Sequence, residues 1–357
     1  MLNFFWPFVT AFLTVLTVTP LVIRLAYRLR LIDDPRYRPH PAHIHKGIVP
    51  RAGGLALLTG IYIPVVLFLP ITKPILGILL AGIATVVIGV FDDRRDLSPY
   101  LRFLGNIATA LLVVGAGLGI PFITNPLGGV LHLDTLRFTF EFLGTHSVLV
   151  LADILAVLWI VWTMNIVGWS SGVDGQMPGF VAIAAVIMGI HSLKFSAHDL
   201  SHTTVATLAF ITAGSFLGFL PWNFYPQKIM PGYGGKTLAG LLLATLAILS
   251  GTKVGSALLI LAIPMLDAAY ALLRRLIGGR SPFKADRSHL HHRLLALGWG
   301  KRRIAIFYWS VSALLGTLAL TLSRELKIFT FLAVSVSVGA VLVWLSFVFR
   351  LEVPEAD

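Results

Sequence analysis

The 357-residue chain contains no cysteine. Disulfides, thiolate zinc sites and cysteine nucleophiles are therefore excluded, and a metal ion could be bound only by Asp, Glu, His or backbone oxygen. Charge is also scarce, because Asp, Glu, Lys and Arg make up 12% of the residues, whereas soluble domains average about 25%. With 57% hydrophobic residues and a mean hydropathy of +0.86, the composition predicts a polytopic membrane protein.

Long apolar runs take the place of the missing charge. About 20 apolar residues, at about 1.5 Å per residue, cross the roughly 30 Å of bilayer hydrocarbon. The runs predict eleven membrane-spanning helices, at 4–25, 52–71, 74–91, 104–122, 148–165, 179–196, 204–220, 237–251, 254–273, 303–322 and 326–349. Because the first run has no basic residue before it and continues past Pro20, we expect a full span there and no secretory signal peptide.

A stretch between the fourth and fifth runs has a different pattern. Residues 130–142 alternate in part between polar and apolar side chains and follow Gly128 and Gly129, which favours a short β-hairpin at the interface. The sequence contains no internal repeat and no low-complexity linker. The predicted fold is therefore an all-α polytopic membrane protein with about 11 transmembrane helices and a short external β-hairpin, in a single domain covering residues 1–357.

The basic residues are distributed unevenly between the predicted loops. Eleven spans place five connections on one side of the membrane, at 24–51, 92–103, 166–178, 221–236 and 274–303. These loops and Arg350 hold 22 of the 28 Lys and Arg residues. The positive-inside rule then predicts a multi-pass protein of the cell membrane whose N-terminus lies outside and whose C-terminus and loops are cytoplasmic. The net charge of +12 is therefore explained by membrane topology and by anionic lipids or phosphorylated substrates as partners. Nucleic acid is not an expected partner.

The same side gathers paired aspartates, histidines and glycines, which indicates a membrane-surface site for an anionic ligand. One alternative is that the basic loops only orient the protein. A transporter is the other alternative, because transporters commonly carry ionisable groups at mid-bilayer in broken helices. Asp267 in the ninth span is the main candidate for such a group, and Asp153 lies near an outer end.

Three loop motifs carry a family resemblance. Residues 45–54 read His-Lys-Gly-Ile-Val-Pro-Arg-Ala-Gly-Gly, residues 89–99 read Gly-Val-Phe-Asp-Asp-Arg-Arg-Asp-Leu-Ser-Pro, and residues 286–294 read Asp-Arg-Ser-His-Leu-His-His-Arg-Leu. Together they resemble the polyprenyl-phosphate N-acetylhexosamine-1-phosphate transferases of glycosyltransferase family 4. That superfamily includes the undecaprenyl-phosphate N-acetylglucosamine-1-phosphate transferases and the phospho-N-acetylmuramoyl-pentapeptide translocases. The resemblance covers nearly the whole chain, since the spans, the hairpin and the loops fall where that family has them.

The resemblance implies a phosphoglycosyltransferase of cell-wall or other cell-envelope glycan biosynthesis. Such an enzyme moves a sugar-1-phosphate, here an N-acetylhexosamine-1-phosphate, from a UDP-sugar to polyprenyl phosphate, releases UMP and requires Mg²⁺. Physical chemistry agrees, because joining a lipid phosphate to a pyrophosphate assembles several negative charges that Mg²⁺, Arg and Lys can offset. Mg²⁺ prefers carboxylate, phosphate and water oxygens as ligands.

Candidate catalytic residues come from the aspartates of these loops. Asp92 and Asp93 lie at the end of a span, and successive helical side chains point about 100° apart. One of them could therefore face a metal or the attacking phosphate while the other faces a neighbouring helix or cation. With Asp174, they are the predicted catalytic residues and metal ligands. The alternative for the pair is a helix end solvated together with Arg94 and Arg95.

The histidine run suits contacts with pyrophosphate or uridine, because imidazoles donate hydrogen bonds even when uncharged. A basic loop at headgroup level is the alternative interpretation. The predicted substrate-binding residues are His45, Arg51, Asn165, Asn223, Lys236, Arg287, His289, His291 and His292. For His45 and Arg51, a role in topology alone stays open.

Two loops depart from the family pattern. Residues 165–175 match Asn-x-x-Asn-Phe-x-Asp-Gly-x-Asp-Gly only in part, because Gly168 replaces the second Asn and Ser171 replaces the first Asp. Residues 232–236 read Gly-Tyr-Gly-Gly-Lys where the family has Gly-Asp-x-Gly-Ser. The phenol of Tyr233 is neutral at pH 7 and a poor Mg²⁺ ligand, so we expect weakened Mg²⁺ binding.

Two interpretations of these departures remain open. The chain is either a transferase whose metal has moved to Asp92, Asp93 or Asp174, or in which Lys236 performs part of the cation's role. Alternatively, it is a catalytically impaired homologue, a pseudoenzyme that binds polyprenyl phosphate or a nucleotide sugar without turnover. The expected partners are polyprenyl phosphate, a UDP-sugar and the membrane, and a homodimer stays open.

Overall fold

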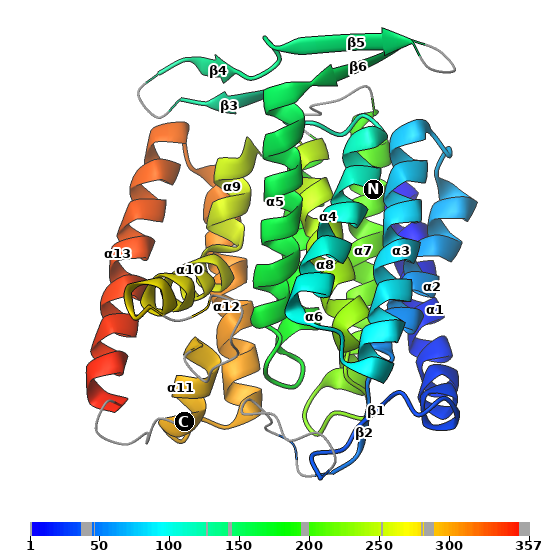
Figure 1. The fold of residues 1–357 in the computed structure, drawn as a ribbon, viewed down its shortest axis with the longest axis vertical. Coiled ribbons are helices and arrows are strands. Elements are labelled where there is room, and N and C mark those ends of the chain that lie inside the picture. The colour runs from blue at the N-terminus through cyan, green and yellow to red at the C-terminus, as the bar shows by residue number, and fades with distance from the viewer. Residues whose placement is uncertain are drawn as a thin grey trace.

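The structure is a computed structural model that describes residues 2–36, 45, 47–125, 128–141, 145–193, 200–250, 253–279, 281 and 289–349. Helices dominate it (Figure 1). They are α1 (Leu2–Arg28), α2 (Gly53–Phe68), α3 (Lys73–Arg95), α4 (Pro99–Gly115), α5 (Val150–Trp169), α6 (Gln176–Ser192), α7 (His202–Asn223), α8 (Gly232–Leu249), α9 (Lys253–Ile260), α10 (Ala262–Ile277), α11 (Leu290–Ala296), α12 (Lys301–Thr321) and α13 (Arg324–Phe349).

Seven described helices are long and apolar enough to cross a membrane, namely α1, α3, α5, α7, α8, α12 and α13, and α2, α4 and α6 are shorter apolar helices. Most of them stand side by side in Figure 1. The chain is therefore a polytopic, predominantly helical membrane protein, as the composition predicts. The number of eleven crossings stays a prediction.

Local sequence signals set several helix ends. Ser98 caps α4, because its Oγ accepts a hydrogen bond from the amide of Leu101 at 3.3 Å, and Pro99 occupies the first helical position. Ser201 caps α7 in the same way through the amide of Thr204 at 3.2 Å. Helix α4 begins at Pro99, five residues before the predicted span, and it packs against α3.

The ninth predicted span, 254–273, is not one continuous helix. It is divided at Leu261 into α9 and α10, and α10 lies across the bundle in Figure 1. Pro264 explains the break, because its ring lacks an amide donor and is incompatible with the carbonyl of Ile260 in a continuous helix. The break brings Asp267, which is fully buried, toward the histidine loop.

The predicted hairpin over 130–142 corresponds to two hairpins. Strand β3 (Phe122–Thr124) pairs with β4 (Val130–His132), and β5 (Arg137–Glu141) pairs with β6 (Thr145–Leu149), both antiparallel. Gly128 and Gly129 have φ values of +124° and +77°, which only glycine adopts readily. They therefore lie in the turn between β3 and β4, so the first hairpin begins at Phe122 and not at residue 130.

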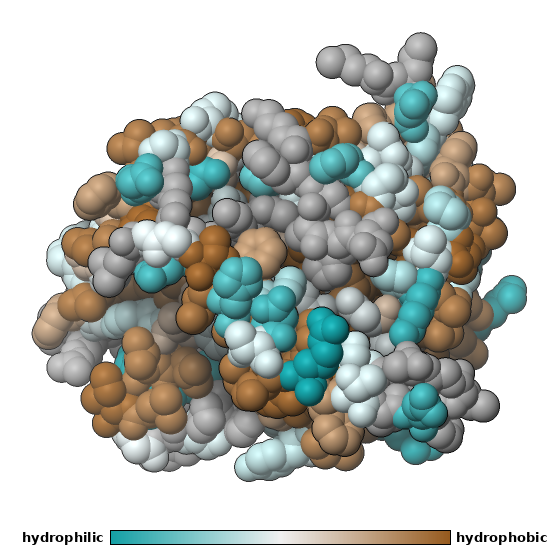
Figure 2. Space-filling view, turned by 90° about the horizontal axis from the view of Figure 1, so that it is seen from above, coloured by the Kyte–Doolittle hydropathy of each residue, from teal (hydrophilic) through white to brown (hydrophobic). Residues whose placement is uncertain are grey.

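Strands mark both ends of the bundle. Strands β3 to β6 lie at the upper end in Figure 1, and β1 (Ile32–Asp33) pairs with β2 (Val49–Pro50) at the lower end. The view onto the upper end shows hydrophilic and hydrophobic residues mixed across that face (Figure 2). The described aspartates and arginines of the loop motifs, such as Arg51, Asp92 and Asp93, belong to the lower end.

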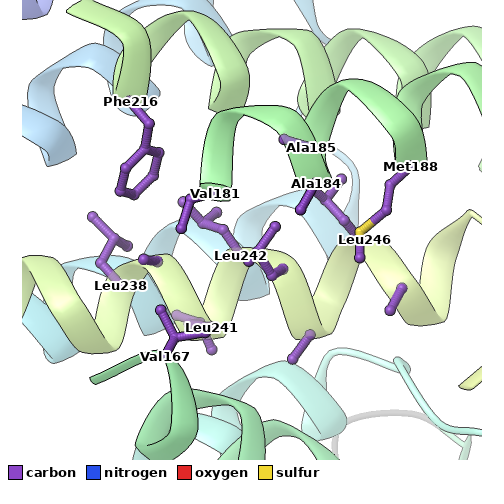
Figure 3. Close-up of a cluster of buried hydrophobic side chains, with 14 of the residues drawn as sticks. Val167, Val181, Ala184, Ala185, Met188, Phe216, Leu238, Leu241, Leu242 and Leu246 are labelled. Atoms are coloured by element: carbon purple, nitrogen blue, oxygen red, sulfur yellow. The ribbon is translucent and has the colours of Figure 1, made fainter. Parts of the chain in front are cut away.

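Helix α8 forms the centre of the bundle. Every residue of α8 is buried except Tyr233 and Lys236, both in its first turns, as expected for a helix that is apolar all round. It packs against α3, α5, α2 and α6. Figure 3 shows this core, with Val167 of α5, Val181, Ala184, Ala185 and Met188 of α6, Phe216 of α7, and Leu238, Leu241, Leu242 and Leu246 of α8. The rigid core thus fixes where the first turn of α8 lies.

Candidate functional site

The first, second and fourth predicted loops meet at the lower end of the bundle. The Nε of Arg51, in the first loop, donates a hydrogen bond to Oδ1 of Asp93 at 3.1 Å. The same oxygen accepts the amide of Tyr233, in the fourth loop, at 3.0 Å. Residues separated by up to 182 positions in sequence are therefore joined through one carboxylate oxygen.

The third and fifth loops join the same end through Asp174. Its Oδ1 accepts a hydrogen bond from Nζ of Lys301 at 3.1 Å, and its Oδ2 accepts the amide of Gln227 at 3.3 Å. The side chain of Asn223 connects two segments. Its Oδ1 accepts a hydrogen bond from the backbone amide of Gly175 at 3.0 Å, and its Nδ2 donates to the carbonyl of Ile229 at 2.9 Å. Asp174 and Asn223 thus hold the third and fourth loops together.

Asp92 is fully buried at the end of α3. Its Oδ1 accepts hydrogen bonds from Nε of Arg102 and from the Leu97 amide. Its Oδ2 lies 4.0 Å from Nη2 of Arg51, and no described residue donates a hydrogen bond to it. The two aspartates therefore face different partners, with Asp92 paired to α4 and Asp93 paired to the first loop and α8, and whether either of them faces a metal or a phosphate stays a prediction.

Arg51 is a shared counter-ion for three aspartates. Besides its bond to Asp93 and its approach to Asp92, its Nη1 lies 3.9 Å from Oδ1 of Asp33. The three carboxylate side chains are at least 94% buried. Because buried charges are tolerated when they are paired and hydrogen-bonded, Arg51 makes this cluster of acids compatible with the folded state.

The start of α8 is shaped around Asp93. A carboxylate at a helix N-terminus is favourable, because it accepts an otherwise unpaired amide and complements the positive end of the helix dipole. Gly232 has a φ of +68°, and a Cβ there would collide with Oδ2 of Asp93 and the carbonyl of Arg51. Glycine is therefore required at position 232 for Asp93 to approach α8.

Tyr233 points away from the cluster of acids. Its hydroxyl donates to Oδ1 of Asn106 at 3.0 Å, with the carbonyl of Arg102 at 3.2 Å as a second acceptor. The guanidinium of Arg102 lies 5.6 Å from the centre of its ring. The phenol thus replaces the family's carboxylate with a group that packs on α4.

Lys236 follows one turn later and faces the acids. The charges of Arg51, Asp93 and Asp33 act on its ammonium group. Within the part of the chain that the structure describes, Lys236 has no hydrogen bond and no ion pair within 4.0 Å. The side chain is only partly exposed, so a cation without a close partner lies beside the cluster.

The histidines occupy different environments. Nδ1 of His289 lies 3.0 Å from Oδ2 of Asp267, whose Oδ1 accepts the amide of Leu290 at 2.7 Å. His291 is 1% exposed, its ring is parallel to that of His289 with centroids 5.8 Å apart, and its Nδ1 has no hydrogen-bond partner in the described ranges. The His292 ring lies 4.2 Å from that of His291.

Burial lowers the pKa of His291 well below its usual value of 6.5, and the neighbouring His292, His289 and Lys236 add to this effect. His291 is therefore a neutral imidazole at neutral pH, which can donate from one ring nitrogen only. Its Nε2 faces Gly172, where any Cβ would collide with the ring. Glycine at that position thus lets the fifth loop approach the third.

His45 lies next to Asp33 in the first loop. Its Nε2 is 3.3 Å from Oδ2 of Asp33 and its Nδ1 is 2.8 Å from the carbonyl of Gly47. The hydrogen bond with Asp33 raises the pKa of His45 above its usual value of 6.5. Asn165 is not part of this arrangement, because its Nδ2 donates to the Val161 carbonyl of its own helix at 2.7 Å. Arg287 lies outside the described residues.

Four residues of this arrangement are absent from the predicted set, namely Asp33, Arg102, Lys301 and Asp267. Each is a charged residue that pairs with a residue of a loop motif, at sequence separations from 10 residues, for Arg102 and Asp92, to 127 residues, for Lys301 and Asp174. For Asp33 the signal was the Asp-Asp pair in the first loop. For the other three, no sequence spacing indicates the partner.

The described residues do not fit a Mg²⁺ site. Asp92, Asp93 and Asp174, the predicted metal ligands, are paired with Arg102, Arg51 and Lys301 respectively. Among the described residues, no three or more His, Asp or Glu side chains are grouped closely enough to hold a metal ion. Mg²⁺ requires a near-octahedral set of oxygens, whereas these carboxylates are already directed at cations of the protein.

Comparison with known proteins gives a consistent picture. Residues 75–251 match the model of glycosyl transferase family 4. The chain is 33% identical to a decaprenyl-phosphate N-acetylglucosaminephosphotransferase of Mycobacterium leprae, over 84% of this chain and 79% of the relative. It is 32% identical to the protein of the same name from Mycobacterium tuberculosis, over 80% and 74%. It is 29% identical to an undecaprenyl-phosphate alpha-N-acetylglucosaminyl 1-phosphate transferase of Haemophilus influenzae, over 90% and 86%. The chain thus belongs to glycosyl transferase family 4, in the superfamily of polyprenyl-phosphate N-acetylhexosamine-1-phosphate transferases that its loop motifs resemble.

Proposed function

We propose that this chain transfers an N-acetylhexosamine-1-phosphate from a UDP-sugar to polyprenyl phosphate and releases UMP. An oxygen of the lipid phosphate forms a bond to the phosphorus that carries the sugar, and the bond from that phosphorus to the bridging oxygen breaks. UMP leaves with that oxygen and its electron pair, and a polyprenyl-pyrophosphoryl sugar for cell-envelope glycan synthesis is formed. Relatives with this kind of name match over at least 80% of the chain.

The observation that carries the proposal is the convergence of acids and cations from all five loops at one end of the bundle. Arg51, Arg102 and Lys236 surround Asp92 and Asp93. Cations fixed in a largely buried position stabilise the charge that develops during phosphoryl transfer. We assign the transfer of a proton from an incoming phosphate to Oδ2 of Asp92, to which no described residue donates a hydrogen bond; loss of that proton increases the nucleophilicity of the phosphate.

The orientation belongs to the proposal as well. We place the chain in the cell membrane with the N-terminus outside, and with the C-terminus and the five loops in the cytoplasm as parts of one domain. UDP-sugars are cytoplasmic substrates in this arrangement, and the polyprenyl phosphate approaches from the bilayer. The basic residues of the loops support this orientation through the positive-inside rule.

A catalytically impaired homologue is the second candidate. Ser171 stands where the family has an acid, and its hydroxyl donates to the carbonyl of Gly168 and not toward the site. Tyr233 also stands where the family has a carboxylate, and its hydroxyl donates to Asn106. For a transporter, in contrast, Asp267 would be the ionisable group at mid-bilayer, yet its two oxygens are directed to His289 and the Leu290 amide. Nothing in this geometry favours transport.

The test is formation of lipid-linked sugar by the purified full chain in lipid nanodiscs. UDP-N-acetylglucosamine and undecaprenyl phosphate serve as substrates with Mg²⁺ present, and UDP-glucose serves as the control donor. The proposal predicts a polyprenyl-pyrophosphoryl sugar and an equal amount of UMP. Binding of the nucleotide sugar without either product would establish the impaired homologue.

A further inference from the structure

Two substitutions in the first turns of α8 change the charge of the site together. With the family pattern, position 233 would carry a carboxylate and position 236 a hydroxyl, whereas this chain has a neutral phenol and an ammonium group. The difference is two positive charges, which equals the charge of one Mg²⁺ ion. Among the described residues, the cations Arg51, Arg102 and Lys236 act on the three buried aspartates Asp33, Asp92 and Asp93, while Arg102 also pairs with Asp96 and His45 with Asp33.

The position of Lys236 supports the same reading. It lies one helical turn after Tyr233, whose amide is bonded to Asp93, and it interacts with the charges of Asp93, Asp33 and Arg51. Arg51 and Arg102 are held by carboxylates at short range, whereas Lys236 keeps its three N–H donors free of the described residues. Ammonium donors beside a cluster of this kind are available to an anion.

A second polar group near Lys236 is also without a partner. The Nδ1 of His291 is buried, lacks a hydrogen-bond partner in the described part of the chain, and belongs to a ring on which the charge of Lys236 acts. A buried polar nitrogen left unpaired is costly. An anion bound by Lys236 therefore has a second candidate donor in His291, when the proton of the neutral ring is on Nδ1.

We propose that Lys236, together with Arg51 and His291, binds the phosphates of the nucleotide sugar in the place where relatives use a divalent metal. The ligand is then a pyrophosphate diester, and this inference rests on the proposed function. The acids then hold the cations in position and do not act as metal ligands. Binding of UDP-N-acetylglucosamine is consequently independent of divalent cations.

The experiment compares binding with and without divalent metal. Isothermal titration of UDP-N-acetylglucosamine into the full chain in nanodiscs is performed in excess EDTA and in Mg²⁺. The proposal predicts dissociation constants that agree within about twofold, because a lost metal contact would change them far more. Affinity that disappears in EDTA would overturn it, and this arm uses the unmodified chain.

Variants test Lys236 itself. Lys236→Ser, the family residue, and Lys236→Met, of similar length without charge, should each weaken binding in EDTA by about 10- to 100-fold, as expected for a charge-assisted hydrogen bond. Lys236→Arg should retain most of the affinity. The matched control is Lys228→Ser, because Lys228 is exposed and packs on Trp222 in the preceding loop. Wild-type affinity in both Lys236→Ser and Lys236→Met would also overturn the proposal.

Release of UMP in the same samples separates this inference from the proposed function. Lys236-dependent binding in EDTA without UMP release in any condition would keep the inference and refute the transferase. Transfer and binding that both require Mg²⁺ would keep the transferase and refute the inference.

Discussion

Arg51 and Asp93 are joined by a hydrogen bond of 3.1 Å that connects the first loop to the end of α3. The oxygen that accepts it also accepts the amide at the start of α8. Arg51 thereby lies close to all three buried acids of the cluster. Its removal takes a cation away from three buried carboxylates.

Arg51→Ala should accordingly destabilise the chain by about 3 kcal/mol or more, the cost of breaking a buried ion pair. Thermal unfolding in nanodiscs measures the change. Asp93→Asn alone should also destabilise, and the double variant should lose less than the sum of the two single losses, because the partners act on each other. Strict additivity would show that the bond contributes nothing to stability.

Tyr233→Phe should lower the free energy of unfolding by about 1 kcal/mol, because the hydroxyl bond to Asn106 is lost. The affinity for UDP-N-acetylglucosamine should not change, since the hydroxyl faces α4 and not the acids. Titration of Tyr233→Phe beside the unmodified chain measures both. A loss of affinity tenfold or greater would place the phenol in contact with the ligand.

Restoring the family pattern should restore dependence on metal. In Tyr233→Asp with Lys236→Ser, the site loses two positive charges, so we expect weak binding of UDP-N-acetylglucosamine in EDTA and recovery when Mg²⁺ is added. Lys236→Ser alone is the control, because it lacks the additional carboxylate. Equal affinities of the double variant in EDTA and Mg²⁺ would contradict this prediction.

The pair of His45 and Asp33 predicts a pH dependence. Because Asp33 raises the pKa of His45 in the folded chain, the folded state holds the proton more tightly than the unfolded state. The pair therefore stabilises the fold below pH about 6.5, the ordinary value for histidine, and the contribution is lost as the pH rises through the raised value. His45→Gln should lower the unfolding midpoint at acidic pH and match the unmodified chain at alkaline pH. An equal difference at every pH would exclude this linkage.

The absence of native cysteine makes the orientation directly testable. Arg95→Cys and Arg137→Cys are exposed positions at opposite ends of the bundle. In intact cells, a membrane-impermeant maleimide should label Arg137→Cys and should not label Arg95→Cys until the membrane is opened. The reverse pattern would invert the proposed topology.

Much of the fold follows from the sequence, because apolar runs and capping residues act locally. Each predicted span overlaps a described helix or, at 254–273, the pair α9 and α10, with ends that differ by up to seven residues at α4. The break in the helix at Leu261 depends on Pro264, whose effect cannot be seen from the hydrophobicity of the run alone. The turn at Gly128 and Gly129 was visible, but which strands flank it was not.

The sequence predicts a part of the site's residues but not which of them pair. The acidic, basic and histidine motifs mark the loops that meet, yet the pair of Arg102 with Asp92 joins α4 to the end of α3 and the pair of Lys301 with Asp174 joins two loops, and both depend on helix packing. The direction of the Tyr233 side chain also depends on Asn106 in another helix. A sequence pattern records which groups are present, while tertiary packing decides which of them face each other.

The central claim is that this chain transfers sugar-1-phosphate with its own cations in the role of the metal. Release of UMP from UDP-N-acetylglucosamine and undecaprenyl phosphate, by the unmodified chain in excess EDTA, tests it most directly. We expect release that depends on the lipid, proceeds at a rate similar to that in Mg²⁺, and is abolished in Lys236→Met. Absence of UMP in EDTA, with release restored by Mg²⁺, would contradict it.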